Sequence, residues 1–183
     1  EEMYVNLPSK VAKSLIVVST VITFDGKLTY ISSRLTANPN LSGFFMIFAH
    51  ASLYVFYSLY LADLGYDKFQ IGLFWALGVA AEVIFFYFQS KVLSRLDAEV
   101  ILQAAFGIGV IRFVLIAFLP ITSVLIIAQL MHAGTFAAHH SAATKLLQRW
   151  FTGPVQARGQ ALMATISYGL GGTLGGLCAG WIW

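Results

Sequence analysis

The sequence predicts an all-α fold, a polytopic membrane bundle of helices, and two observations predict it. The 183 residues are 58% hydrophobic and 10% charged, with a mean hydropathy of +0.78, whereas soluble proteins average about 25% charged residues. The chain also contains several apolar runs close to the roughly 20 residues that a helix needs to cross about 30 Å of hydrocarbon. Both observations are typical of membrane proteins and argue against a soluble domain.

Five apolar runs are expected to be transmembrane helices, and together they form the predicted bundle, residues 41–183. They cover residues 41–62, 69–90, 100–119, 121–144 and 159–183. The connections 63–68, 91–99 and Pro120 are short. Consecutive helices must therefore run in opposite directions.

The segment before the bundle, residues 1–40, has a different character. Its apolar run 15–24 is too short to cross a membrane, is rich in β-branched residues and is followed by Asp25-Gly26, a pattern typical of a β-hairpin. An interfacial segment or the end of a preceding helix would give the same pattern. We treat the segment as a cytoplasmic linker, which Asn38 should end by capping the first long helix.

The basic residues indicate orientation in the membrane rather than a nucleic-acid partner. If the first 40 residues are cytoplasmic, nine of the eleven Lys and Arg residues lie on the cytoplasmic side. Of the other two, Lys68 lies on the opposite side and Arg112 lies inside a predicted transmembrane helix. This asymmetry follows the positive-inside rule and places the N-terminus in the cytoplasm. The single cysteine, Cys178, has no partner, so neither a disulfide nor a metal site is expected.

Three ionisable residues are predicted inside the membrane, on three successive helices: Glu82, Arg112 and His132. A carboxylate near the bilayer centre costs roughly 2.5 kcal/mol or more, so such residues usually face the bundle interior and mark an ion or substrate path. At about 1.5 Å per residue, Arg112 lies ~10 Å, His132 ~16 Å and Glu82 ~20 Å below the outer surface. Arginine keeps its charge and imidazole titrates near neutral pH, so this order suits a proton relay. A structural ion pair is the alternative interpretation.

Polar and aromatic side chains recur at helical spacing, and we expect their stripes to converge on one cavity. The residues that we expect to contact substrate are His50, Tyr54, Tyr57, Trp75 and Gln129. Tyrosine and tryptophan also serve as packing residues and interfacial anchors. Toward the cytoplasmic end, His139 and His140 continue the stripe of the fourth helix, where contact with lipid headgroups and a role in proton exit are the two alternatives.

Glycines spaced four residues apart in the last helix predict close contact with another helix, because small residues let two helix backbones approach. They are Gly171, Gly172, Gly175, Gly176 and Gly180. Rocking helices in a transporter, static packing and dimer formation all fit this pattern.

Several stretches carry a family resemblance. YSLYLADLGY (57–66), IGLFWALGVAAEV (71–83), Ile111-Arg112 and MHAGTF (131–136) together resemble the C-terminal half of the phenylpropionate-permease-type transporters of the major facilitator superfamily. One superfamily signature, Gly-x-x-x-Asp-Arg-x-Gly-Arg-Arg between spans eight and nine, is not matched, since residues 89–96 keep only Lys91 and Arg95.

The resemblance implies a twelve-span proton symporter of the bacterial cytoplasmic membrane, in which this chain supplies spans seven to eleven of two six-helix halves. An N-terminal half and a twelfth span would then be its partners. The substrate would be a small organic solute, an aromatic carboxylate such as 3-phenylpropionate, with a sugar or a nucleoside as alternatives. In the similar lactose-permease group, acidic, Arg and His residues of spans eight to ten serve proton coupling, and by span position these correspond to Glu82, Arg112 and His132.

Other classes of function remain open or are disfavoured. A membrane b-type cytochrome is the alternative function, because His50 and His132 are predicted at matching depth and could bind one haem. The transporter hypothesis requires no cofactor. An inactive half-transporter is a third interpretation. An enzyme is not expected, because the chain has no Gly-x-Ser-x-Gly, no Cys/His metal cluster and no phosphate-binding loop.

Overall fold

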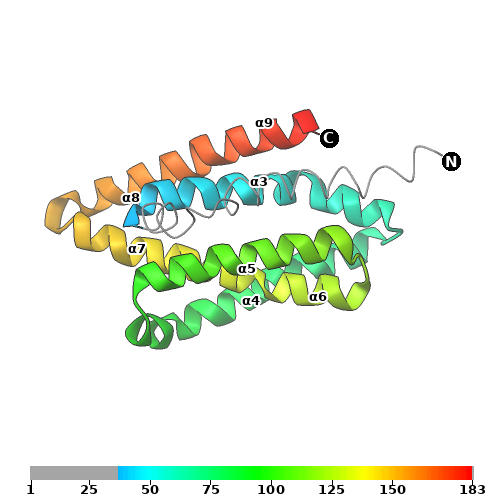
Figure 1. Cartoon of the computed structure of the whole chain (residues 1–183), viewed down its shortest axis with the longest axis horizontal. Coiled ribbons are helices and arrows are strands. Elements are labelled where there is room, and N and C mark those ends of the chain that lie inside the picture. Colours follow the sequence, from blue (N-terminus) through cyan, green and yellow to red (C-terminus); the bar gives the residue numbers. More distant parts are fainter. Residues whose placement is uncertain (1–36, 183) are drawn as a thin grey trace, which may run out of the picture.

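The computed structural model describes residues 37–182, which are helical apart from short turns (Figure 1). The helices are α3 (Pro39–Asp63), α4 (Lys68–Arg95), α5 (Ala98–Phe118), α6 (Thr122–Leu130), α7 (Ala138–Trp150), α8 (Gln156–Ala164) and α9 (Gly172–Ile182). Between them lie two π-helical segments, η1 (Ala133–Ala137) and η3 (Thr165–Gly171), and the 3₁₀ turn η2 (Gly153–Val155). No strand occurs in residues 37–182, and the predicted all-α membrane bundle is confirmed. The hairpin or linker expected before residue 37 lies outside the described residues.

Local sequence signals set the starts of the first two helices. Asn38 caps α3 as predicted, because its side chain accepts hydrogen bonds from the backbone N–H groups of Asn40 and Leu41. Asp67 and Gln70 form a capping box at the start of α4, in which each side chain accepts the other residue's backbone N–H. These caps satisfy the free N–H groups of the first turn, so the connections between helices can stay short.

Four stretches of the described chain are long and apolar enough to cross a membrane: Pro39–Asp63, Lys68–Arg95, Ala98–Phe118 and Gly153–Trp181. Each overlaps one of the five predicted helices. The predicted helix 121–144 is instead divided into α6, η1 and α7, with a turn at Met131. A π-helical turn inside an α-helix is frequent at functional sites, so this interruption draws attention to the residues around it.

Successive long helices run in opposite directions, as their short connections require (Figure 1). Helix α3 packs against α7, η3 and α9, while α5 packs against α6, η1 and α7. Helix α4 packs against α6, η1 and α7. Two apolar clusters form the core, one containing Leu53 and Leu125 and the other containing Leu102 and Leu147. Since α4 and α5 both contact η1, this π-helical segment lies between them.

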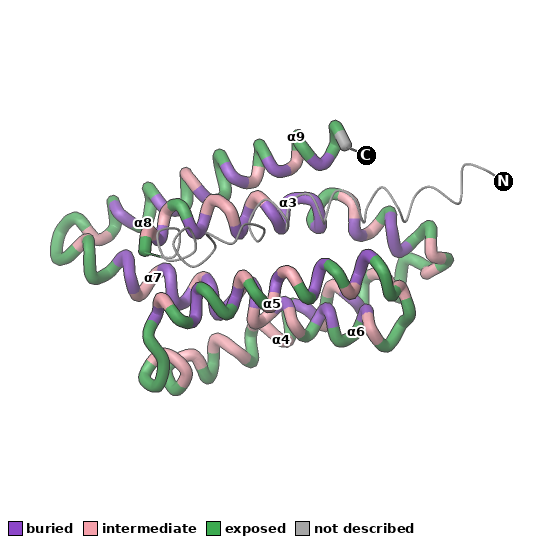
Figure 2. Tube along the Cα trace, viewed as in Figure 1, coloured by how far each residue is buried: buried purple, intermediate pink, exposed green. Residues whose placement is uncertain are grey.

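Burial differs sharply between α3 and α4 (Figure 2). In the most apolar window of α3, 56% of the residues are buried, against 11% in α4. Only Phe74 and Gly78 are buried in α4. Most of α4 therefore faces away from the packed interior, and a charge on its inner side lies at the boundary of the bundle.

Two glycines of the predicted last helix, Gly171 at the end of η3 and Gly175 in α9, let this stretch approach α3 closely. A Cβ at Gly171 would lie 2.7 Å from the carbonyl oxygen of Phe44. A Cβ at Gly175 would overlap the carbonyl oxygen of Phe48. In both cases the atom in the way is backbone, which cannot rotate aside, so only glycine fits without moving a helix.

The remaining three glycines of the series are less constrained. A Cβ at Gly172 or Gly176 would lie 3.6 or 3.9 Å from an α3 side chain, which is ordinary van der Waals distance. Gly180 is exposed, and a Cβ there would meet no atom within 4 Å in the described part of the chain. The contact with α3 therefore depends mainly on Gly171 and Gly175.

Candidate functional site

Polar side chains from several helices meet in the middle of the bundle. We call this group the central cluster: His50 on α3, Glu82 on α4, Arg112 on α5, and Gln129, His132 and Thr135 in the stretch from α6 to η1. All except Thr135 were singled out in the sequence. Residues that are up to 85 positions apart thereby come within hydrogen-bond distance.

Glu82 and His132 form a carboxylate–imidazole contact at the edge of the cluster. Glu82 Oε1 lies 2.6 Å from His132 Nε2. The Glu82 side chain is 16% exposed and that of His132 is 6% exposed. Glu82 therefore keeps partial access from outside, and His132 connects it to the interior.

Arg112 is fully enclosed, and acceptors surround its guanidinium. Nε donates to the carbonyl oxygen of Ala128 at 2.7 Å, and Nη2 donates to Gln129 Oε1 at 3.3 Å. Nη1 lies 2.8 Å from His132 Nδ1 and 3.2 Å from His50 Nε2. A buried charge is tolerated only when its donors are satisfied. These contacts provide that compensation on three sides of the guanidinium.

The contacts of Arg112 determine where each imidazole carries its proton. Arginine can only donate, so His132 Nδ1 and His50 Nε2 must both accept. His132 therefore has its proton on Nε2, which donates to Glu82. His50 has its proton on Nδ1, which donates to the carbonyl oxygen of Met46 at 2.9 Å. Arg112, His132 and Glu82 thus form a hydrogen-bonded chain, in which the neutral imidazole of His132 links the guanidinium to the carboxylate.

The π-helical segment η1 supplies Thr135, which the sequence analysis missed. Its hydroxyl donates to the carbonyl oxygen of His132 at 3.1 Å. The hydroxyl oxygen of Thr135 also lies 3.3 Å from Arg112 Nη1 and 3.3 Å from His50 Nε2. Threonine in an apolar helix commonly bonds only to its own backbone, and nothing in the sequence marked this turn as π-helical.

The five residues predicted to contact substrate separate into two groups. His50, Tyr57 and Gln129 are at most 2% exposed, so they lie inside the bundle, where His50 and Gln129 contact Arg112. Tyr54 is 42% exposed, and its ring stacks on that of Trp75 with 6.2 Å between the centroids. The open aromatic surface beside the cluster is therefore formed by Tyr54 and Trp75.

Gly78 is a second residue whose role the sequence analysis missed. It lies one turn before Glu82, and a Cβ there would be 3.1 Å from Gln129 Oε1 and 3.6 Å from His132 Cδ2. The absent side chain lets α4 come close enough for Glu82 to reach His132. A glycine four residues before a carboxylate, inside an apolar helix, was the available signal.

The histidines do not fit the haem that was the alternative. The ring centroids of His50 and His132 are 5.4 Å apart, which places the two rings in direct contact. Axial ligands of one haem lie on opposite faces of the macrocycle with the iron between them, whereas here Arg112 Nη1 lies between the two rings, 3.2 Å from His50 Nε2 and 2.8 Å from His132 Nδ1. Each ring nitrogen also has a hydrogen-bond partner.

Comparison with known proteins supports the family resemblance. The chain is 35% identical over 99 residues to a protein of Escherichia coli (strain K12) named "Probable 3-phenylpropionic acid transporter". The match covers 54% of this chain and 26% of that protein, so the aligned part spans about a quarter of the relative's length. No solved structure matches the chain.

The family model described as MFS_1 like matches residues 35–183. This match covers the whole of the described bundle, including the central cluster. It confirms the predicted resemblance and the expectation of a transporter family rather than an enzyme family. The chain, a multi-pass membrane protein with several long apolar helices, therefore belongs to the MFS_1-like family of the major facilitator superfamily.

Proposed function

We propose that the complete protein is a proton-coupled symporter of a small organic anion, an aromatic carboxylate of the same kind as 3-phenylpropionate. The family and the name of the E. coli relative support transport of such a solute. One observation carries the coupling to protons. It is the contact of Glu82, at the edge of the bundle, with His132, which the enclosed Arg112 holds from the other side.

Glu82 is the group that binds the proton in this mechanism. The other acidic residues of the described chain lie at helix ends or in connections: Asp63, Asp67, Asp97 and Glu99. Oε1 of Glu82 accepts a hydrogen bond from His132, which leaves Oε2 to take the proton. His132 keeps the same tautomer in both states, because Arg112 continues to donate to its Nδ1.

Protonation of Glu82 removes its negative charge, so that an anionic substrate can bind beside it. Two ionised carboxylates in contact repel each other, so an ionised Glu82 opposes a carboxylate substrate. Protonated Glu82 is instead a hydrogen-bond donor to that carboxylate. Proton and anion therefore bind together, and the exposed ring of Tyr54 with the half-buried ring of Trp75 offers a surface for an aromatic substrate.

Arg112 is a positioning residue in this mechanism. It is fully enclosed and directs its donors at the cluster, so a substrate on the open face does not reach it. Its effect on Glu82 passes through His132. The exposed face of α4 is where we propose that the N-terminal half of the transporter packs and closes the substrate site.

We further propose that the protein lies in a bacterial cytoplasmic membrane with the N-terminal side of α3 in the cytoplasm. The end of α4, the end of α7 and the start of α8 lie at one end of the bundle (Figure 1). Basic residues gather there: Lys91, Arg95, Lys145, Arg149 and Arg158. Lys68 begins α4 at the opposite end, so the asymmetry follows the positive-inside rule.

Transport by the complete protein with Glu82→Gln tests the proposal. In proteoliposomes with labelled 3-phenylpropionate, we expect accumulation driven by a pH gradient to be lost. Downhill exchange should remain, because a glutamine amide is neutral and still donates a hydrogen bond to a carboxylate.

Glu99→Gln is the matched control, since Glu99 is a 43% exposed carboxylate that faces Arg149 at 3.7 Å at the end of the bundle. Its accumulation should equal that of the unmodified protein. Accumulation by Glu82→Gln at the unmodified level would contradict the role of Glu82.

A further inference from the structure

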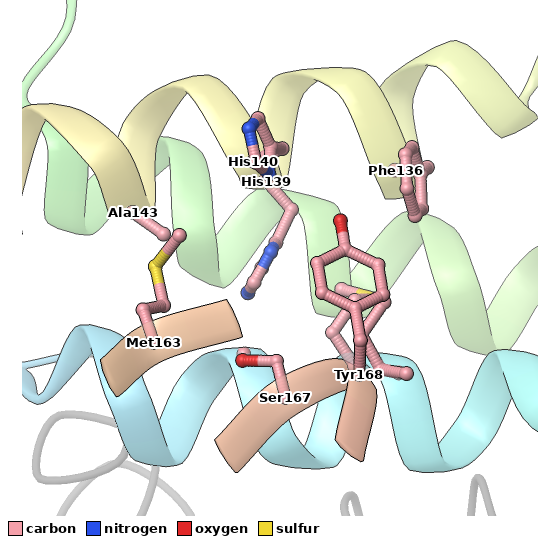
Figure 3. Close-up of a pocket in the computed structure, with 10 residues that line it drawn as sticks. Phe136, His139, His140, Ala143, Met163, Ser167 and Tyr168 are labelled. Carbon is pink, nitrogen blue, oxygen red and sulfur yellow. The ribbon is translucent and has the colours of Figure 1, made fainter. Parts of the chain in front are cut away.

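A second site with polar side chains lies among α3, α7 and η3 (Figure 3). We call it the inner cavity. Its walls include Ser167, Tyr168, Met163, His139 and His140. The cavity volume is about 20 Å³, and a polar cavity needs roughly 10–15 Å³ to hold a water molecule. The inner cavity therefore has room for one water.

Ser167 gives this cavity an unsatisfied polar atom. Its side chain is 2% exposed, and its hydroxyl has no hydrogen-bond partner among the described residues. Figure 3 shows the hydroxyl on the cavity wall, with the His139 ring extending from α7 toward it. Buried hydroxyls are normally paired with protein or with ordered water. A single water in the cavity would supply that partner.

Two imidazoles that the central cluster does not use border the cavity. His139 Nε2 lies 2.8 Å from Ser42 Oγ on α3, and the His139 ring meets Phe106 of α5 edge-on at 5.6 Å. His140 meets the ring of Phe86 on α4 edge-on at 6.4 Å. Imidazole is the side chain best suited to exchange protons near neutral pH. The cavity thus combines two such groups with space for water.

Phe136 lies between His132 of the central cluster and His140 of the inner cavity. Its ring stacks on His132 with 5.5 Å between centroids and an angle of 22°, and on His140 with 6.4 Å and 9°. The three residues are four positions apart on one helical face, and Phe136 lines the cavity. The phenyl ring of Phe136 has no group that donates or accepts a conventional hydrogen bond. The two polar sites therefore follow one another along the bundle, but this ring does not connect them by hydrogen bonds.

We propose that the inner cavity is a second proton site, in which Ser167 holds one water beside His139 and His140. The proton released by Glu82 passes to the inner cavity and from there to the basic end of the bundle, where α7 ends. Phe136 is the barrier between the two sites, and it prevents protons from leaking when no substrate moves. This inference rests on the proposed function, because it assigns the exit of the same proton.

The barrier is tested by proton leak in the complete protein. Liposomes containing Phe136→Ala should lose an imposed pH gradient about tenfold faster than the unmodified protein in the absence of substrate, because water can then bridge His132 and His140. Phe118→Ala is the control, since Phe118 is 61% exposed and lies at the end of α5. If Phe136→Ala does not reconstitute, Phe136→Val replaces it. A gradient as long-lived as in the unmodified protein would overturn the barrier role.

The cavity is tested by Ser167→Val, which removes the hydroxyl and fills the space with methyl groups. Accumulation driven by a pH gradient should slow about tenfold, whereas substrate exchange, which needs no net proton exit, should be unchanged. Ser167→Thr keeps the hydroxyl and should retain most of the rate. An experimental density map should show one water beside Ser167 Oγ. Unchanged accumulation in Ser167→Val, or an empty cavity, would overturn the proposal.

The two levels of inference fail in different ways. If the unmodified protein shows no proton-driven accumulation, or if Glu82→Gln accumulates normally, the proposed symport itself is wrong. If Glu82→Gln loses accumulation while the Phe136 and Ser167 variants behave like the unmodified protein, symport stands and the inner cavity has no part in it.

Discussion

The central cluster and the inner cavity each contain two histidines and a hydroxyl side chain, and they differ in how these are bonded. In the central cluster, both nitrogens of His50 and His132 have partners, Arg112 donates to one nitrogen of each ring, and Gln129 Nε2 is the atom left unpaired among the described residues. In the inner cavity, Ser167 has no protein partner in the described chain, and space for a water remains. A buried cation thus organises the first site rigidly, whereas the second site, which lacks one, depends on water.

The largest expected effect comes from removing that cation. Arg112→Leu would remove the donor from acceptors of five residues and would leave the charge of Glu82 without compensation. Breaking a buried charge network in this way costs about 3–5 kcal/mol. We expect the free energy of unfolding in mixed detergent micelles to fall by that amount.

Arg149→Leu is the matched control for this experiment. The Arg149 side chain is 51% exposed and lies 3.7 Å from Glu99, and exposed pairs of this kind contribute about 0.5 kcal/mol or less. Equal losses in the two variants would mean that the central cluster is not organised by its arginine.

The charged core of the central cluster was predictable from sequence because burial of charge is so costly. Glu82, Arg112 and His132 each interrupt an apolar run, and such residues must find one another or water. Their order of contact, with His132 in the middle, follows from their expected depths. The sequence therefore indicated the chain of three before any contact was known.

The rest of the site depends on tertiary geometry that no local pattern encodes. Thr135 joins the cluster because of a π-helical turn, and Gly78 matters because α4 approaches α6 at that point. His50 and Gln129 are enclosed rather than open to substrate, since the approach of neighbouring helices decides which part of a polar stripe stays accessible.

A change at the contact between η3 and α3 should have a smaller effect than loss of Arg112. In Gly171→Ala the new Cβ would press on the carbonyl oxygen of Phe44, so η3 must move away from α3. Such overpacking costs about 1–3 kcal/mol. We expect a lower free energy of unfolding and slower proton-driven accumulation, with substrate exchange preserved because η3 contributes no residue to the central cluster.

Gly180→Ala provides the comparison, because that position is exposed and a Cβ there meets no atom within 4 Å in the described part of the chain. Its unfolding should be indistinguishable from that of the unmodified protein. A Gly171→Ala protein as stable as Gly180→Ala would show that the contact between η3 and α3 does not set the wall of the inner cavity.

The smallest expected effect tests the hydrogen bond that joins α3 to the inner cavity. Ser42→Ala removes the partner of His139 Nε2 and should lower the free energy of unfolding by about 1 kcal/mol. Ser52→Ala is the control, because the Ser52 hydroxyl is equally buried but donates to the carbonyl oxygen of Ala49 in its own helix. In a hydrated cavity, a water molecule can replace the Ser42 hydroxyl as the partner of His139. The loss in free energy of unfolding for Ser42→Ala will then be smaller and will approach the loss for Ser52→Ala. A loss as large as that of Arg112→Leu would instead mean that the inner cavity is as rigid and dry as the central cluster.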